Sequence, residues 1–146
     1  GSIMSSLKVD NITGRGNAGF TGSVKSEGGN TTTDLQQGLA KAWADIAAGV
    51  GSSMPDSFNC SSIDDDASGE CGVNIASDMS SANYSAQVTI IFGHAADDSN
   101  SLRTATIEST ATGAVELDFS YVNGSGLHVA QDLETGASTI IHGDLA

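Results

Sequence analysis

Basic residues are scarce in this chain, which has five Lys and Arg against 18 Asp and Glu and a formal net charge of −13. Binding to a nucleic-acid backbone depends on Lys and Arg that displace its counterions, so we expect no nucleic-acid partner. An anionic membrane surface is disfavoured for the same reason. No apolar run approaches the ~20 residues of a membrane span, so we expect no membrane insertion. The charge favours a soluble protein displayed on a surface.

Proline and aromatic residues are also few, with one proline and 5% Phe, Trp and Tyr among 146 residues. The 18 glycines and the many Ser, Thr and Asn residues favour turns and strands. Long helices are disfavoured because these polar side chains compete for backbone hydrogen bonds inside a helix. The length suits one domain with its own core. We expect Gly1–Ile3 to be a cloning scar and Met4 to be the natural start.

Only two cysteines are present, Cys60 and Cys71, on either side of an expected turn. A disulfide between them would close a short hairpin loop and contribute about 2–3 kcal/mol. The sequence does not decide between this disulfide and two free thiols, and both states stay open. Two cysteines are too few for a structural zinc site.

Alternation of apolar and polar residues predicts a series of short strands. The clearest examples are Tyr84–Phe92 and Val115–Tyr121. Ser57–Ile63 and Glu70–Ile75 flank an acidic turn, Asp64–Gly69, and predict a hairpin. Arg103–Glu108 is a weaker strand signal. A turn at Asn123–Gly126 leads from Val115–Tyr121 into a strand at Leu127–Ala130, and Ser138–His142 is the last strand. This spacing predicts a mainly β protein, an antiparallel β-sandwich of jelly-roll type.

The N-terminal part differs in composition from the rest. A short extended piece, Leu7–Ile12, precedes a Gly-rich stretch and a run of Ser, Gly, Asn and Thr at Ser26–Thr33. We therefore divide the chain into an extended N-terminal arm or linker, residues 4–33, and a β-sandwich body, residues 34–146.

The start of the body carries two conflicting patterns. Thr33 or Asp34 is a good N-cap, which predicts one short helix over Asp34–Leu39. Gly38 weakens a helix by ~1 kcal/mol relative to Ala. We therefore expect the helix to end early and a strand to follow it through Ile46.

The acidic turn resembles part of a calcium-binding loop. Asp64, Asp66, Ser68 and Gly69 match positions 1, 3, 5 and 6 of an EF-hand loop. Ile75, however, stands where that loop needs a bidentate Glu, and no helices are expected on either side. An acidic hairpin turn is the favoured interpretation, and weak calcium binding is the alternative.

Nothing in the sequence indicates catalysis. Gly14–Gly19 matches G-x-G-x-x-G, but a poor helix former follows it, so a Gly-rich arm explains it better than a dinucleotide site. No G-x-S-x-G elbow is present. His94, His128 and His142 are scattered, with no second ligand at metal spacing. We expect no catalytic, cofactor-binding or metal-ligating residues and no enzymatic activity.

Aromatic side chains offer one binding hypothesis. Trp43, Tyr84 and Tyr121 could form a platform on which sugars stack, although packing in the core or at an interface is the favoured interpretation.

Four separated stretches of the chain together resemble small structural proteins of tailed bacteriophages of the marine type. The stretches are Met4–Ile12, Asp34–Trp43, the hairpin region (Asp56–Asn59, Ser61–Ile63 and Asn83–Tyr84) and Ile141–Ala146. Cys60 and Cys71 depart from the family pattern, which more often has an apolar and an aromatic residue there.

The resemblance implies a non-enzymatic virion protein that forms a surface appendage, a short tail fibre or fibre tip. It would serve host attachment or particle decoration. Such a protein is made in the host cytoplasm and stands on the virion surface. Its implied partners are copies of itself, as a trimer, other virion proteins and a host cell-surface glycan. A capsid-decorating knob without a receptor role is one alternative. The acidic loop motivates another, a calcium-dependent carbohydrate-binding module.

Overall fold

The computed structural model describes most of the chain, namely residues 23–25, 32–34, 38–47, 53–91, 103–132 and 136–146. The chain divides into two compact units, Gly1–Gly38 and Leu39–Ala146. In the first unit, strands β1 (Ser23–Lys25) and β2 (Thr32–Asp34) pair antiparallel.

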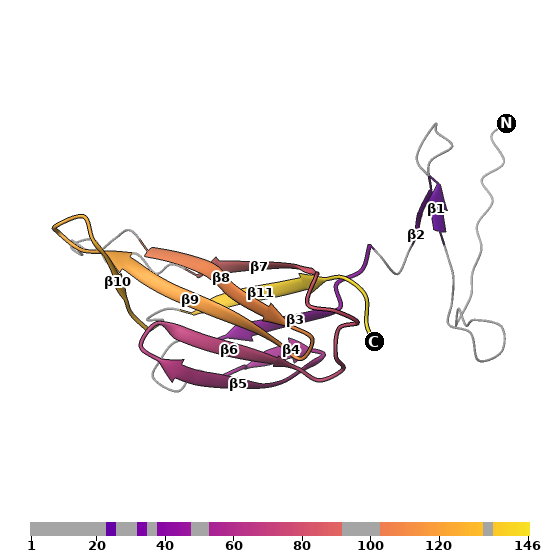
Figure 1. The fold of residues 1–146 in the computed structure, drawn as a ribbon, viewed down its shortest axis with the longest axis horizontal. Coiled ribbons are helices and arrows are strands. Elements are labelled where there is room, and N and C mark those ends of the chain that lie inside the picture. The colour runs from indigo at the N-terminus through magenta and orange to yellow at the C-terminus, as the bar shows by residue number, and fades with distance from the viewer. Residues whose placement is uncertain (1–22, 26–31, 35–37, 48–52, 92–102, 133–135) are drawn as a thin grey trace, which may run out of the picture. The chain divides into compact units, whose positions relative to one another are not determined.

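The second unit consists of two antiparallel sheets packed face to face (Figure 1). One sheet has four strands, in the order β4 (Asp56–Phe58), β3 (Ala42–Ile46), β11 (Ala137–His142) and β7 (Ser85–Ile90). The other has five strands, in the order β10 (His128–Ala130), β9 (Ala114–Val122), β6 (Glu70–Ile75) and β5 (Cys60–Ala67), with β8 (Arg103–Ala111) also paired to β9. This arrangement confirms the predicted mainly β, sandwich-like fold.

The core lies between the two sheets and is built from every second residue of their strands. The strand residues of the core are Ala42, Ala44, Ile46, Cys71, Val73, Ile75, Val115, Leu117, Phe119, Ala137 and Ile141, and Met79 joins them from outside the named strands. Because side chains alternate across a strand, each of these strands buries one face and leaves the other outward. A single polar side chain, Thr139, is buried among the described residues, and its hydroxyl donates a 2.8 Å hydrogen bond to the Gln87 carbonyl.

The two strands with the clearest alternation are confirmed. β9 buries Val115, Leu117 and Phe119, as the pattern predicts. β7 turns Ala86, Val88 and Ile90 toward the core, and Phe92, at the end of the predicted strand, lies outside the described residues. The turn after β9 is also confirmed, because the Asn123 side-chain oxygen accepts hydrogen bonds from the backbone N–H groups of Ser125 and Leu127, each 3.0 Å long.

The predicted strand over Ser57–Ile63 is wrong as a single element. The chain passes from the four-stranded sheet to the five-stranded sheet at Asn59, so that β4 pairs with β3 and β5 pairs with β6. Asn59 adopts a φ of 53°. Asn tolerates this left-handed conformation better than most residues because its side chain can form local hydrogen bonds.

The predicted turn over Asp64–Gly69 is wrong in its length. β5 continues through Ala67, and the turn contains only Ser68 and Gly69. A register shift between Asp65 and Ala67 allows the pairing with β6 to extend this far.

The described residues contain no helix, so the predicted helix over Asp34–Leu39 is wrong where it can be compared. Asp34 ends β2, and Gly38 and Leu39 lie in a turn and a bend. Residues 35–37 lie outside the described residues. The three Thr residues before Asp34 favour a strand, and Gly38 disfavours a helix. The strand expected through Ile46 is confirmed as β3.

Several predictions for the N-terminal part lie outside the described residues. These are the extended piece at 7–12 and the Gly-rich motif at 14–19. The division into an arm, 4–33, and a body, 34–146, therefore stays a prediction.

Candidate functional site

The outer surface of the four-stranded sheet brings together side chains from four distant segments. The strand register aligns two neighbouring rows across this surface. One row contains Phe58, Trp43, Ile140 and Gln87, and the other contains Asp56, Asp45, Ser138 and Thr89. We refer to these eight residues as the Trp43 face.

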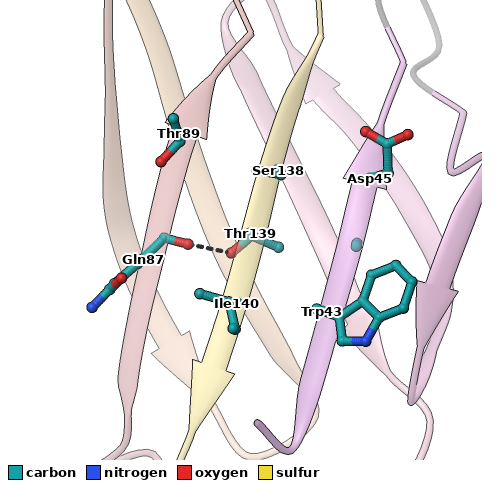
Figure 2. A pocket seen from close by; sticks show the side chains of 8 residues that line it. Trp43, Asp45, Gln87, Thr89, Ser138, Thr139 and Ile140 are labelled. Atoms are coloured by element: carbon teal, nitrogen blue, oxygen red, sulfur yellow. Dashed lines mark hydrogen bonds between the residues drawn. The ribbon is translucent and has the colours of Figure 1, made fainter.

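A hollow of about 410 Å³ lies in the Trp43 face (Figure 2). Its walls are Trp43 and Asp45 from β3 and Gln87 and Thr89 from β7, with β11 between them. The small side chain of Ser138 stands in the middle of its row, flanked by Asp45 and Thr89. The hollow therefore lies at Ser138, and a larger side chain at this position of β11 would fill it.

The polar groups around the hollow are available to a ligand. The side chains of Asp45, Thr89 and Ser138 form no hydrogen bond or ion pair with any part of the chain that the structure describes. The side-chain amide of Gln87 is also without such a partner, since Gln87 contributes only its backbone carbonyl, to Thr139. These groups include one carboxylate, one amide and two hydroxyls, which together can donate and accept hydrogen bonds.

Of the three aromatic residues considered for a sugar-binding platform, only Trp43 lies on this face. The Tyr84 side chain packs against the core, and its hydroxyl lies 2.7 Å from the Ala114 carbonyl and 3.0 Å from that of Ala111. Tyr121 belongs to β9 in the other sheet. The structure thus does not bring the three aromatic side chains together.

Phe58 is the aromatic neighbour of Trp43 that the sequence analysis missed. The two residues are directly opposite each other on β4 and β3, and Phe58 is 53% exposed. Recognising the pair requires the register between these strands, which depends on the break at Asn59. The only sign of this break in the sequence is that an apolar residue, Phe58, is followed by Asn59, a residue type that tolerates positive φ.

The outer surface of the five-stranded sheet is acidic. Glu116 lies near four other carboxylates, those of Asp64, Asp66, Glu70 and Glu108. Its pKa is raised above the ordinary carboxyl value, first by burial and then by these negative charges, Asp66 first among them. The Asp64 carboxylate accepts a 2.6 Å hydrogen bond from the Asn74 side chain.

This acidic surface does not have the geometry of the calcium loop considered above. Asp64 and Asp66 lie on the extended strand β5, whereas an EF-hand loop must curl around its ion. Among the described residues, no group of three or more His, Cys, Asp or Glu side chains could hold a metal ion.

The two histidines that the structure describes lie in different sheets. His128 lies on β10, with its Nδ1 3.4 Å from the Ser120 hydroxyl, while His142 ends β11 in the other sheet. His94 lies outside the described residues.

Both cysteines are free thiols. Cys60 is opposite Ile75, whereas Cys71 is opposite Asp65. The four-residue offset along β6 corresponds to about 14 Å, since each strand residue rises by ~3.4 Å. A disulfide requires Cα atoms less than about 7 Å apart, so the register decides the open question in favour of two thiols.

Comparisons with known proteins give no relatives. No protein-family model, no curated protein and no solved structure matches the chain. In the part of the chain that the structure describes, no helix has the length and apolar character that crossing a membrane would need.

Proposed function

We propose that this chain is a non-enzymatic structural protein of a bacteriophage particle, a surface appendage such as a short tail fibre or fibre tip. The observation that carries the proposal is the partition of the chain. A short N-terminal unit, Gly1–Gly38, is separate from a β-sandwich with its own core, Leu39–Ala146. Such a partition suits an arm that docks on the particle and a body that projects from it. We propose a jelly-roll-type connectivity for that body.

The surface of the sandwich supports a role in display. One sheet presents a group of carboxylates, and the chain as a whole has a net charge of −13. Repulsion between like charges keeps copies soluble and opposes random association. Ordered assembly would then depend on specific contacts, and we propose a trimer, located on the virion surface and contacting other virion proteins.

The distribution of reactive groups is consistent with a non-enzymatic role. The Cys71 thiol is buried, and its pKa is raised to about 11, first by burial and then by nearby carboxylates. Cys60 is half-buried, with a pKa that burial also raises. Neither thiol has the lowered pKa that activates a cysteine nucleophile.

Light scattering tests the assembly. We expect a mass of three times 14.7 kDa for the full-length protein, unchanged when salt is varied between 0.1 and about 0.5 M, a range that screens surface charges. A mass of one chain at high concentration would contradict the oligomer.

Antibody labelling of intact particles in the electron microscope tests the location. Label at the tail supports a fibre or fibre tip. Label over the head shell supports the alternative, a capsid-decorating knob. The absence of label from particles, with the antibody still binding the purified protein, would overturn both.

A second candidate function, a carbohydrate-binding module, is favoured by the hollow in the Trp43 face. Calcium dependence is a separate part of that hypothesis. A calorimetric titration with calcium, and a melting curve with and without chelator, test it directly: no heat and no shift in Tm would remove the calcium dependence.

A further inference from the structure

We propose that the hollow in the Trp43 face is a binding site for a neutral saccharide and that it works without a metal ion. The proposal rests on the proposed attachment function for its biological role, since a surface sugar would be the receptor. The site itself is inferred from the geometry of β3, β7 and β11.

The chemistry of the hollow matches the two kinds of surface that a sugar ring presents. A pyranose has an apolar C–H face and an edge of hydroxyl groups. Trp43 offers an aromatic surface for the apolar face. Asp45, Gln87 and Ser138 offer acceptors and donors for the hydroxyl edge. The volume of about 410 Å³ lies within the range of small-molecule sites, roughly 300–1,000 Å³.

The site is held by a rigid scaffold. Its residues lie on three neighbouring strands, and β11 pairs with both β3 and β7 over its length. The strand beneath the hollow is fixed from inside by Ala137, Thr139 and Ile141, which are all buried. A preformed site loses little entropy on binding, which favours recognition of a small ligand.

Charge argues for a neutral ligand. Among the residues that the structure describes, Asp45 is the only charged one that lines the hollow, and Asp56 lies directly opposite it on β4. With 18 acidic residues in the chain, an anionic sugar would be repelled. Hydroxyl groups, in contrast, donate well to a carboxylate.

The same charges argue against a second copy of the chain as the occupant. Docking a copy on this face would bury Asp45 and Asp56. Buried carboxylates need cationic partners, and each copy has only five Lys and Arg in all. The cores of protein interfaces are also depleted of charged residues.

Trp43 provides a direct reporter, because it is the single tryptophan of the chain. The experiment titrates the full-length protein with neutral hexasaccharides of glucose, galactose, mannose or N-acetylglucosamine, and with oligogalacturonate as an anionic probe. It records Trp43 emission and calorimetric heat. We expect at least one neutral sugar to give a saturable change in both signals. This change should persist in chelator and at raised salt, and oligogalacturonate should give none.

Variants then locate the site. Ser138→Ile fills the hollow with a residue that favours strands, and it should weaken binding at least tenfold while Trp43 still reports. Ser109→Ile makes the same change at an exposed position on β8 in the other sheet and should bind as the wild type does. Trp43→Phe, followed by calorimetry, should weaken binding while retaining an aromatic ring.

Three results would overturn the proposal: no binding of any neutral hexasaccharide, binding unaffected by Ser138→Ile, or binding lost in chelator. A change in oligomer mass caused by Ser138→Ile, without sugar binding, would assign the face to contacts between copies and overturn it too. None of these results bears on the location of the protein in particles. Conversely, sugar binding by a protein absent from particles would refute the virion function alone.

Discussion

Asn59 and Ser77 are joined by two hydrogen bonds between the Asn side chain and the Ser backbone. The Ser77 N–H donates to the Asn59 side-chain oxygen over 2.8 Å, and the Asn59 side-chain amide donates to the Ser77 carbonyl over 3.2 Å. The same amide group also donates to the Lys41 carbonyl over 3.0 Å. One side chain thus fixes the point where the chain passes between the two sheets.

We expect Asn59→Ala to lower the free energy of unfolding by roughly 3 kcal/mol. The substitution removes three hydrogen bonds, each worth about 1 kcal/mol. It also leaves at positive φ a residue whose side chain cannot form the local hydrogen bonds that let Asn tolerate this conformation. Asn59→Gly removes the same hydrogen bonds but tolerates the backbone conformation, so its loss should be smaller. Urea unfolding at pH 7 measures both. Equal losses in the two variants would show that backbone strain contributes nothing.

Gly69 is needed for both its conformation and its lack of a side chain. Its φ is +82°, and an added Cβ would lie 2.5 Å from the Phe119 carbonyl oxygen and 2.8 Å from the Gln131 nitrogen. Because both obstacles are backbone atoms, they cannot move aside easily. We expect Gly69→Ala to cost about 3 kcal/mol or more, since it combines overpacking with backbone strain.

Two other glycines are matched controls for this substitution. Gly126 has a φ of +77° but open space around it, so Gly126→Ala should cost only the backbone strain, about 1 kcal/mol. Gly124 has open space and no positive φ, and Gly124→Ala should be close to neutral. Chemical denaturation should therefore show that Gly124→Ala is the most stable of the three variants, Gly126→Ala the next and Gly69→Ala the least stable. A loss for Gly69→Ala no larger than that for Gly126→Ala would contradict the geometry of the β5–β6 turn.

Glu116 makes the stability depend on pH in a defined direction. Its pKa is raised in the folded protein, so the folded state binds the proton more readily than the unfolded state does. The charged carboxylate therefore destabilises the fold at neutral pH. This destabilisation decreases as the pH falls through the raised pKa of Glu116. It is absent once the pH is below the ordinary pKa of a Glu carboxyl.

We expect Glu116→Gln to raise Tm at pH 7 by roughly 1–2 °C, which corresponds to about 0.5 kcal/mol for a surface group. The difference from the wild type should shrink as the pH falls toward 4. Raised salt should remove only part of the difference in Tm. Salt screens charge repulsion, but burial is the larger cause of the raised pKa of Glu116. Differential scanning calorimetry over this pH range is the measurement. A lower Tm for the variant at pH 7 would contradict the assignment.

The two thiols should remain reduced and react slowly in the folded protein. With a pKa of about 11, only about one in a thousand Cys71 side chains is a thiolate at pH 8. We expect alkylation of Cys71 by iodoacetamide to be at least 100-fold slower in the folded state than in urea. Mass spectrometry of protein unfolded without reductant should show two adducts per chain. No adducts there would indicate the disulfide that the register forbids.

The sequence predicted well the elements whose pattern is local. Alternation alone identified β7 and β9 and the face that each buries, because the period of two is a property of the strand itself. It also identified the turn at Asn123, where one side chain satisfies nearby backbone groups. The helix expected from a capping residue was wrong in the described residues, since a cap signal is weaker than strand propensity and a following glycine.

What the sequence by itself determined is a β-rich, strongly acidic chain with apolar residues enough for one sandwich. Only the tertiary structure decided that Trp43 has Phe58 and Ile140 as neighbours, that Ser138 leaves a hollow among polar groups, and that the thiols stay apart. The physical reason is that these relationships depend on the register between strands far apart in the chain. A shift of one residue would reverse every face, and no local pattern specifies that alignment.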